Sequence, residues 1–254
     1  MIETLIVCII AGLGAGIGTG FAGLSAAAVI SPMLVTFLGF DSYEAVGIAL
    51  ASDVLASAIS AYTYGKNKNL DIKNGLVMMV TVLLFTMIGS FVASLVPGTA
   101  MGNLSVLMTF LLGIRFILWP VMTTKDLLAS KSPRLQAAEA LIGGIVIGFI
   151  CGFIGAGGGM MMLFVLTTIL GYELKTAVGT SVFIMTFTAF TGAVSHFSIG
   201  GLPDPFAFFV CVIATLAGAQ VTAKIANRSD PKTLNRMTGI VLTALGTVMI
   251  AVQL

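Results

Sequence analysis

The sequence predicts an all-α polytopic membrane protein built from two inverted repeats of about five helical segments each, with short or re-entrant half-helices. Three observations predict this fold. Of the 254 residues, 58% are apolar and only 9% are charged, far below the ~25% charged residues of soluble domains. A Gly-rich apolar passage occurs twice in the chain. The basic residues fall in loops that can share one side of a bilayer.

The repeated passage begins at Gly16 and returns 132 positions later. Without gaps, residues 16–47 match residues 148–179 at 11 of 32 positions, and both passages end in the triplet Ala-Val-Gly. Internal duplication in such an apolar chain is typical of transporters. We therefore expect a first transmembrane repeat at 1–122, a cytoplasmic linker at 123–135 and a second, inverted repeat at 136–254.

Polar breaks divide each half into five apolar segments. They are expected at about 4–24, 25–38, 43–64, 74–96 and 104–122, and then at about 136–155, 157–170, 175–199, 206–226 and 236–254. The second segment of each half is only about fourteen residues long, which gives ~20 Å of helix against a hydrocarbon core of ~30 Å. Each is therefore interpreted as a half-helix, either re-entrant or a tilted crossing.

The distribution of Lys and Arg predicts the orientation. If the first two segments of each half return to the side where they began, eleven of the twelve basic residues lie on one face, and only Arg115 lies inside a span. If they form one broken crossing instead, six basic residues face five. Since cytoplasmic loops are enriched in Lys and Arg, the first arrangement is favoured. It places the basic loops in the cytoplasm and both termini outside.

Loops in equivalent places of the two halves differ in charge, because one carries Lys or Arg and the other carries neither. This difference predicts that the two halves are inverted relative to each other. Segments three and four are joined by KNKNLDIK in the first half and by GGLPDP in the second. Segments four and five are joined by the neutral PGTAMGN and then by the basic NRSDPKTLNR. An odd number of crossings in each repeat produces this exchange of sides.

The starts of the two half-helices are the candidate binding site, because inverted repeats with broken helices bind their substrate near the bilayer midplane. Small residues there let a ligand approach the backbone N–H groups, and the positive end of the helix dipole favours an anion. The site residues predicted in this way are Ser25, Ala26, Gly157, Gly158 and Gly159. The alternative is that glycines only allow close helix packing, which suits those of the first segment in each half better.

The same residues resemble a known family. The passage GFAGLSAAAVISPML, and in the second half GFICGFIGAGGG followed by AVGTSVFI, is similar to the paired signatures of the TauE/SafE sulfite exporter family over nearly the whole chain. The resemblance implies export of sulfite, organosulfonates or related sulfur-containing anions across the inner (plasma) membrane. The first half departs from the family's Gly-rich cluster, and it reads AVGIALASD where the second reads AVGTSVFIM. The hydroxyl groups expected at the site are accordingly those of Ser52, Thr180 and Ser181.

Two ionisable residues lie deep within predicted spans, where burying a charge is expensive and usually serves function. Arg115 is a candidate ligand for the oxygens of the anion. Asp53 is a candidate carrier of a coupling proton. The alternative for both is a structural ion pair that joins Asp53 to Arg115.

The function predicted from these features is an exporter of a small sulfur-containing oxyanion, which works by alternating access as a secondary transporter rather than as an enzyme. Its expected partners are the anion and the bilayer, with no nucleic acid, cofactor or metal, and a homodimer is one option. One alternative is a channel, or a carrier of another small solute such as a metal cation. A less favoured alternative is a membrane-embedded enzyme, for which a single histidine and two deep charges provide little.

Overall fold

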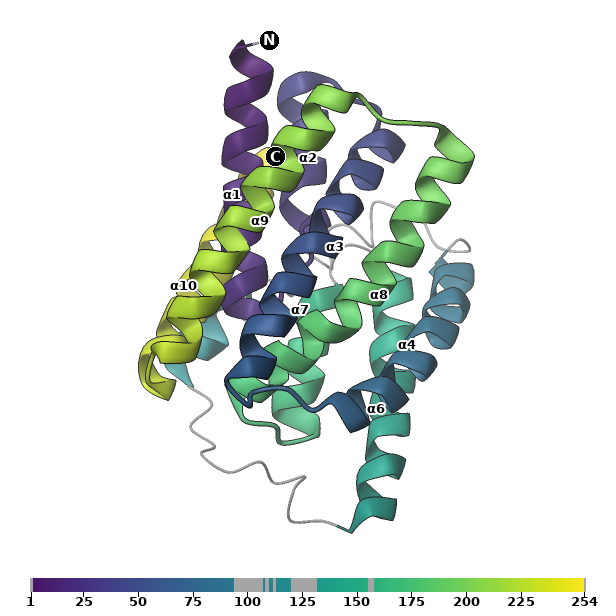
Figure 1. Ribbon diagram of the computed structural model, residues 1–254, viewed down its shortest axis with the longest axis vertical. Helices are drawn as coiled ribbons and strands as arrows, with labels where there is room; N and C mark the ends of the chain where they lie inside the picture. Colours follow the sequence, from purple (N-terminus) through teal and green to yellow (C-terminus); the bar gives the residue numbers. More distant parts are fainter. Residues whose placement is uncertain are drawn as a thin grey trace.

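The structure, a computed structural model, describes residues 2–93, 107, 110–111, 113–119, 132–154 and 158–253. These residues form helices joined by short loops, with no strand among them, which confirms the predicted all-α class. The helices are α1 Ile2–Ala22, α2 Ala27–Leu38, α3 Ser42–Lys66, α4 Ile72–Ala93, α6 Pro133–Ile154, α7 Gly158–Phe164, the π-helical turn η1 Val165–Ile169, α8 Leu174–Gly200, α9 Pro205–Arg228 and α10 Pro231–Gln253 (Figure 1).

Five of the described helices, α1, α3, α4, α8 and α9, are long and apolar enough to cross a membrane. Many of their large apolar side chains point away from the bundle: Met87 is 73% exposed and Ile213 is 65% exposed. A water-soluble protein rarely exposes so much apolar surface, whereas lipid tails cover it without cost. The protein is therefore a multi-pass membrane protein.

Aspartates start four of the helices, because a carboxylate can accept the unpaired N–H groups of a first turn. Asp41 accepts a hydrogen bond from the Tyr43 amide at the start of α3. In the same way, first-turn amides of α4, α9 and α10 donate to the carboxylates of Asp71, Asp204 and Asp230. Hydrogen bonds from Thr233 lower the pKa of the Asp230 carboxyl. Each capping aspartate therefore lies in a loop, just before the apolar span that follows it.

The two short segments predicted from the sequence are confirmed as short helices. The first is α2, with 12 residues, and the second is α7 with η1, with seven and five residues. Both are followed by a glycine with positive φ, Gly39 at +67° and Gly171 at +70°, a conformation that glycine adopts without strain at a helix end. These two glycines are matched in the sequence repeat.

Each short helix runs back along the helix before it. A Cβ placed on Gly14 of α1 would lie 3.6 Å from Val29 of α2, and one placed on Gly143 of α6 would lie 2.7 Å from Leu170. The return of α2 toward the N-terminal end of α1 is visible in Figure 1. Of the two arrangements weighed above, the described helices therefore adopt the one in which the first two segments return to the same side.

Glycines bring α1 against α9, and α6 against α4, in parallel pairs. A Cβ on Gly12 would lie 3.0 Å from the Cys211 carbonyl oxygen, and Gly16, one turn on, lies against Thr215. In the other pair Gly144 meets Met78, and Gly148 meets Val82. In lipid the hydrophobic effect does not drive helices together. Small residues instead allow the backbones of two helices to approach closely, and this packing holds the pair together. The packing role considered for these glycines is therefore confirmed.

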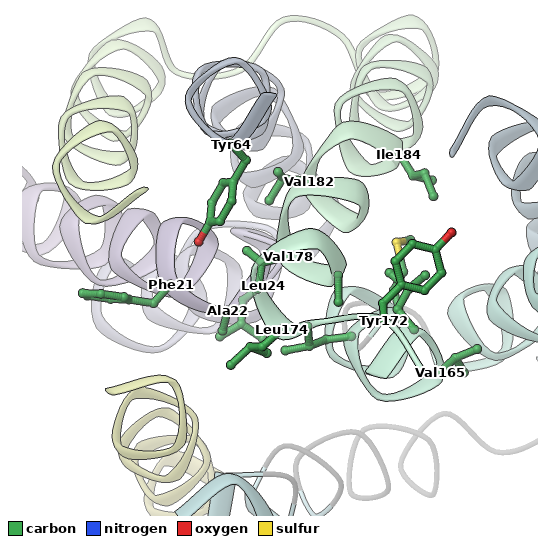
Figure 2. Close-up of a cluster of buried hydrophobic side chains, with 14 of the residues drawn as sticks. Phe21, Ala22, Leu24, Tyr64, Val165, Tyr172, Leu174, Val178, Val182 and Ile184 are labelled. Carbon is green, nitrogen blue, oxygen red and sulfur yellow. The ribbon is translucent and has the colours of Figure 1, made fainter. Parts of the chain in front are cut away.

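At the centre of the bundle α3 and α8 cross in opposite directions. Gly47 near the start of α3 packs against Phe197 near the end of α8, and Gly179 of α8 packs against Tyr64 near the end of α3. Buried apolar side chains from α1, α3, η1 and α8 surround this crossing. Figure 2 shows them, with the Tyr64 hydroxyl directed toward α1, where it donates to the Gly20 carbonyl at 2.9 Å.

The described basic residues other than Arg115 lie near the ends of α3 and α9 and the starts of α4, α6, α8 and α10, which meet at the lower end of the bundle in Figure 1. Hydrogen bonds tie this end together: Asn69 donates to the Asn227 side chain at 2.7 Å, and Lys175 donates to the Asn227 carbonyl at 3.1 Å. The basic residues described there are Lys66, Lys68, Lys73, Arg134, Lys175, Lys224, Arg228, Lys232 and Arg236. The arrangement fits the charge count made from the sequence.

Candidate functional site

The chain breaks between α1 and α2 over residues 23–26. Gly23 turns the backbone with φ +61°, a left-handed conformation that side chains disfavour. The Thr19 hydroxyl donates to the Leu24 carbonyl at 2.8 Å and fixes the end of α1. The Ser25 hydroxyl accepts weakly from the Ala27 amide, at 3.4 Å. Ser25 and Ala26 therefore stand at the positive end of α2, as predicted.

The start of α7 lies directly against this break. A Cβ on Gly159 would lie 2.7 Å from the Gly23 carbonyl oxygen and 2.9 Å from the Ser25 nitrogen. No side chain larger than hydrogen fits there without moving the backbone. Gly158 is the first residue of α7, and Gly157 lies outside the described residues. The structure thus brings Gly159 to Ser25, two site residues that are far apart in the sequence.

Asp53 of α3 faces the same place and is fully buried. It accepts a hydrogen bond from the Ser57 hydroxyl at 3.0 Å through Oδ1. The Ser25 hydroxyl and the Ala26 amide lie close enough to interact with its carboxyl, but the geometry leaves Oδ2 without a hydrogen-bonding partner. Among the side chains whose burial is described, Asp53 is the one charged group that is fully buried.

Of the three predicted hydroxyl groups, Ser181 is the one that the described contacts place against the break. Ser181 packs against Gly23 and donates to the Val178 carbonyl at 2.8 Å. Ser52 donates to the carbonyl of Ile48, also at 2.8 Å. Thr180 accepts from the Asp71 amide at 3.2 Å and so lies toward the basic end. Ser52 and Ser181 would have to give up bonds within α3 and α8 to donate to a ligand.

Arg115 is not among the residues that touch the break. Its guanidinium lies 5.6 Å from the ring centroid of Phe164 and 5.8 Å from that of Phe116. Phe164 lies five residues after Gly159, about 7.5 Å along the helix axis. Its Nη1 is buried without a hydrogen-bonding partner. Among the described interactions there is no ion pair between Asp53 and Arg115, so each presents an unsatisfied polar atom to the interior.

Comparison with known proteins identifies the family. The model of the sulfite exporter TauE/SafE family matches residues 8–249. The chain belongs to the TauE/SafE family. It is 26% identical to the probable membrane transporter protein YunE of Bacillus subtilis over 96% of both chains. It is also 26% identical to the probable membrane transporter protein MJ0441 of Methanocaldococcus jannaschii, over 95% of this chain and 94% of the relative. No solved structure matches.

Further polar residues of this TauE/SafE chain escaped the sequence reasoning. Ser57 and Ser60 follow Asp53 at positions four and seven, on the same face of α3, and both are fully buried. The Ser60 hydroxyl, like Oδ2 of Asp53, has no partner. Buried polar atoms without partners require water or a ligand. The helical spacing from Asp53 was the signal that could have found these serines.

The second half carries no matching carboxylate at the start of its short helix. Met185, which lies 132 positions after Asp53, places its sulfur 3.1 Å from where a Cβ on Gly159 would stand. The two helix breaks therefore differ in the side chain beside them, which is a carboxyl group at α2 and a thioether at α7.

Proposed function

We propose that this protein is a secondary transporter of the cell membrane that exports a small sulfur-containing oxyanion, sulfite or an organosulfonate, by alternating access. The observation that carries the proposal is the meeting of the two helix breaks, with Gly159 against Gly23 and Ser25. The family model that matches the chain is named for sulfite export. The named relatives are described as probable membrane transporters.

The chemistry of the junction suits an oxyanion. The start of α2 directs the positive end of a helix dipole and the Ala26 amide toward the break. Ser25 adds a hydroxyl, and Ala26 carries only a methyl group. Burial strengthens such interactions because no bulk water competes with them.

The helix pairs support two inverted repeats. The first helix of repeat one, α1, pairs with the fourth helix of repeat two, α9, and α6 pairs with α4 in the same way through glycines 132 positions apart. The third helices, α3 and α8, cross in opposite directions. Contacts paired in this way are what a two-fold axis in the membrane plane would produce. With the basic end in the cytoplasm, both termini lie outside, and the repeats span 1–122 and 136–254 around a cytoplasmic linker.

Polar contacts at both ends of α3 and α8 support alternating access. At one end Tyr43 stacks on His196 with ring centroids 4.1 Å apart, and Glu44 accepts from the Asp204 amide at 2.7 Å. At the basic end Thr180 and Tyr172 both bond to Asp71. The buried junction lies between these two closures. Opening one closure at a time gives the site access to one side at a time.

Reconstituted vesicles test this function. Uptake of sulfite, methanesulfonate, sulfoacetate, chloride and a divalent cation is measured with and without a proton gradient. We expect saturable transport of the sulfur oxyanions, and faster exchange when the opposite side holds the same anion. Flux that does not saturate would indicate a channel, and transport of the cation alone would indicate a cation carrier.

Arg115 offers a second test, because its unpartnered Nη1 leaves a positive charge in the interior that can attract the anion toward the junction. Replacing Arg115 by Gln is expected to raise the apparent KM for the anion about tenfold or more, because this attraction is lost. Arg115→Lys keeps the charge and is expected to have a smaller effect. Equal losses in both variants would instead assign Arg115 to packing between Phe116 and Phe164.

A further inference from the structure

Asp53 stands where the proposed anion would bind. Its fully buried carboxyl faces the Ser25 hydroxyl and the Ala26 amide at the positive end of α2, and its Oδ2 has no partner. An ionised carboxylate occupies this positive end in place of an anion and repels any anion that approaches. A protonated carboxyl does the opposite, because its O–H can donate to an oxyanion.

Among the described residues, none places a positive charge beside Asp53 that would change this outcome. The described ionisable groups of the four helices packed against α3 lie toward helix ends: Glu3, Lys175, His196, Lys224 and Arg228, together with the buried thiols of Cys8 and Cys211. The Arg115 guanidinium lies beside Phe164 instead. A negative charge on Asp53 is therefore compensated by neutral donors alone, and a second negative charge beside it has no counter-ion.

We propose that the anion and a proton on Asp53 bind together, so that each anion crosses the membrane accompanied by one proton. The inference rests on the proposed function and adds that the proton and the anion move in the same direction. On one side of the membrane the Asp53 carboxylate takes up a proton from water, and the resulting O–H donates to an oxygen of the bound anion. On the other side the anion leaves, and the carboxyl returns its proton to water.

Polar groups next to Asp53 give this proton a path. The Ser57 hydroxyl already donates to Oδ1 of Asp53, and Ser60 lies one turn farther toward the basic end with its hydroxyl unpartnered. Side chains three residues apart on a helix are about 5–6 Å apart. One water molecule bridges such a gap. The path ends near Tyr64, which bonds to the Gly20 carbonyl.

The consequence for transport is a fixed charge balance. A monovalent sulfonate that moves with one proton carries no net charge, so the membrane potential neither drives nor opposes it. Outward movement then depends on the concentration gradient of the anion, since the usual inward proton gradient opposes it. A carrier that exchanged the anion for a proton would show the reverse dependence.

Binding of methanesulfonate to the purified protein between pH 5 and 9 is the decisive experiment, because this anion keeps its charge throughout. We expect the apparent Kd to rise about tenfold per pH unit above the pH at which Asp53 ionises. Asp53→Asn, which stays neutral, is expected to bind tightly with no pH dependence. The matched control Glu3→Gln removes an exposed carboxylate and is expected to behave as the unaltered protein does.

Transport by the unaltered protein in vesicles tests the same proposal without relying on the Asp53→Asn variant. With the unaltered protein, a pH-sensitive dye is expected to report one proton per methanesulfonate, and an imposed potential is expected to leave the rate unchanged. An affinity independent of pH, or one that increases with pH, would overturn the joint binding. If the protein binds no sulfur oxyanion at any pH, the proposed function itself fails.

Discussion

Replacing Gly159 by Val is expected to abolish anion transport while the protein still inserts in the membrane. The added side chain meets backbone atoms of the other break, since even a Cβ would lie 2.7 Å from the Gly23 carbonyl oxygen and 2.9 Å from the Ser25 nitrogen. Neither atom can rotate away, so the two breaks must separate. A shift of about 1 Å at a binding site can cost ~100-fold in rate.

Gly143→Ala is the matched control for this variant. Its Cβ would also lie 2.7 Å from its nearest neighbour, but that neighbour is a terminal carbon of the flexible Leu170 side chain. We expect nearly unchanged vesicle uptake for Gly143→Ala and none for Gly159→Val, with equal helical content by circular dichroism. Full uptake by Gly159→Val would show that the breaks need not touch for transport.

Gly16→Ala is expected to destabilise the protein strongly, because the close pairing of α1 and α9 excludes a methyl group. A Cβ there would lie 2.7 Å from the Ala219 nitrogen and 3.0 Å from the Gly218 Cα. Overpacking of this kind costs ~1–3 kcal/mol, which should lower the melting temperature of the detergent-solubilised protein by several degrees.

The neighbouring Gly14 provides the comparison. A Cβ on Gly14 would lie 3.6 Å from Val29, which is ordinary contact distance, so Gly14→Ala is expected to leave the melting temperature unchanged or to raise it slightly through better helix propensity. Similar melting temperatures for Gly14→Ala and Gly16→Ala would contradict the tight pairing of α1 with α9.

Much of the fold could be predicted because bilayer constraints act locally on the sequence. Apolar runs between polar loops gave the described helices to within a few residues, as for α9, expected at 206–226 and observed as Pro205–Arg228. The short helices followed from length alone. Matched glycines such as Gly39 and Gly171 end them in the same conformation, since a positive φ leaves a clear trace in composition.

The site was harder to predict because it depends on contacts between distant segments. The sequence indicated Ser25 and Gly159 separately, but only the fold brings one against the other. It marked Asp53 as a buried charge without revealing that the carboxyl faces the start of α2. Sequence reasoning also left an Asp53–Arg115 ion pair open, whereas Arg115 packs between two aromatic rings. Which groups face one another across packed helices is set by helix rotation.

A crystal structure of the protein soaked with selenite tests the central claim most directly, because selenite has the shape of sulfite and its selenium scatters anomalously. An anomalous peak is expected within hydrogen-bonding distance of Ser25 and Ala26, beside Gly159. A peak that appears only elsewhere, for instance between Arg115 and Phe164, would contradict a binding site at the junction of the two helix breaks.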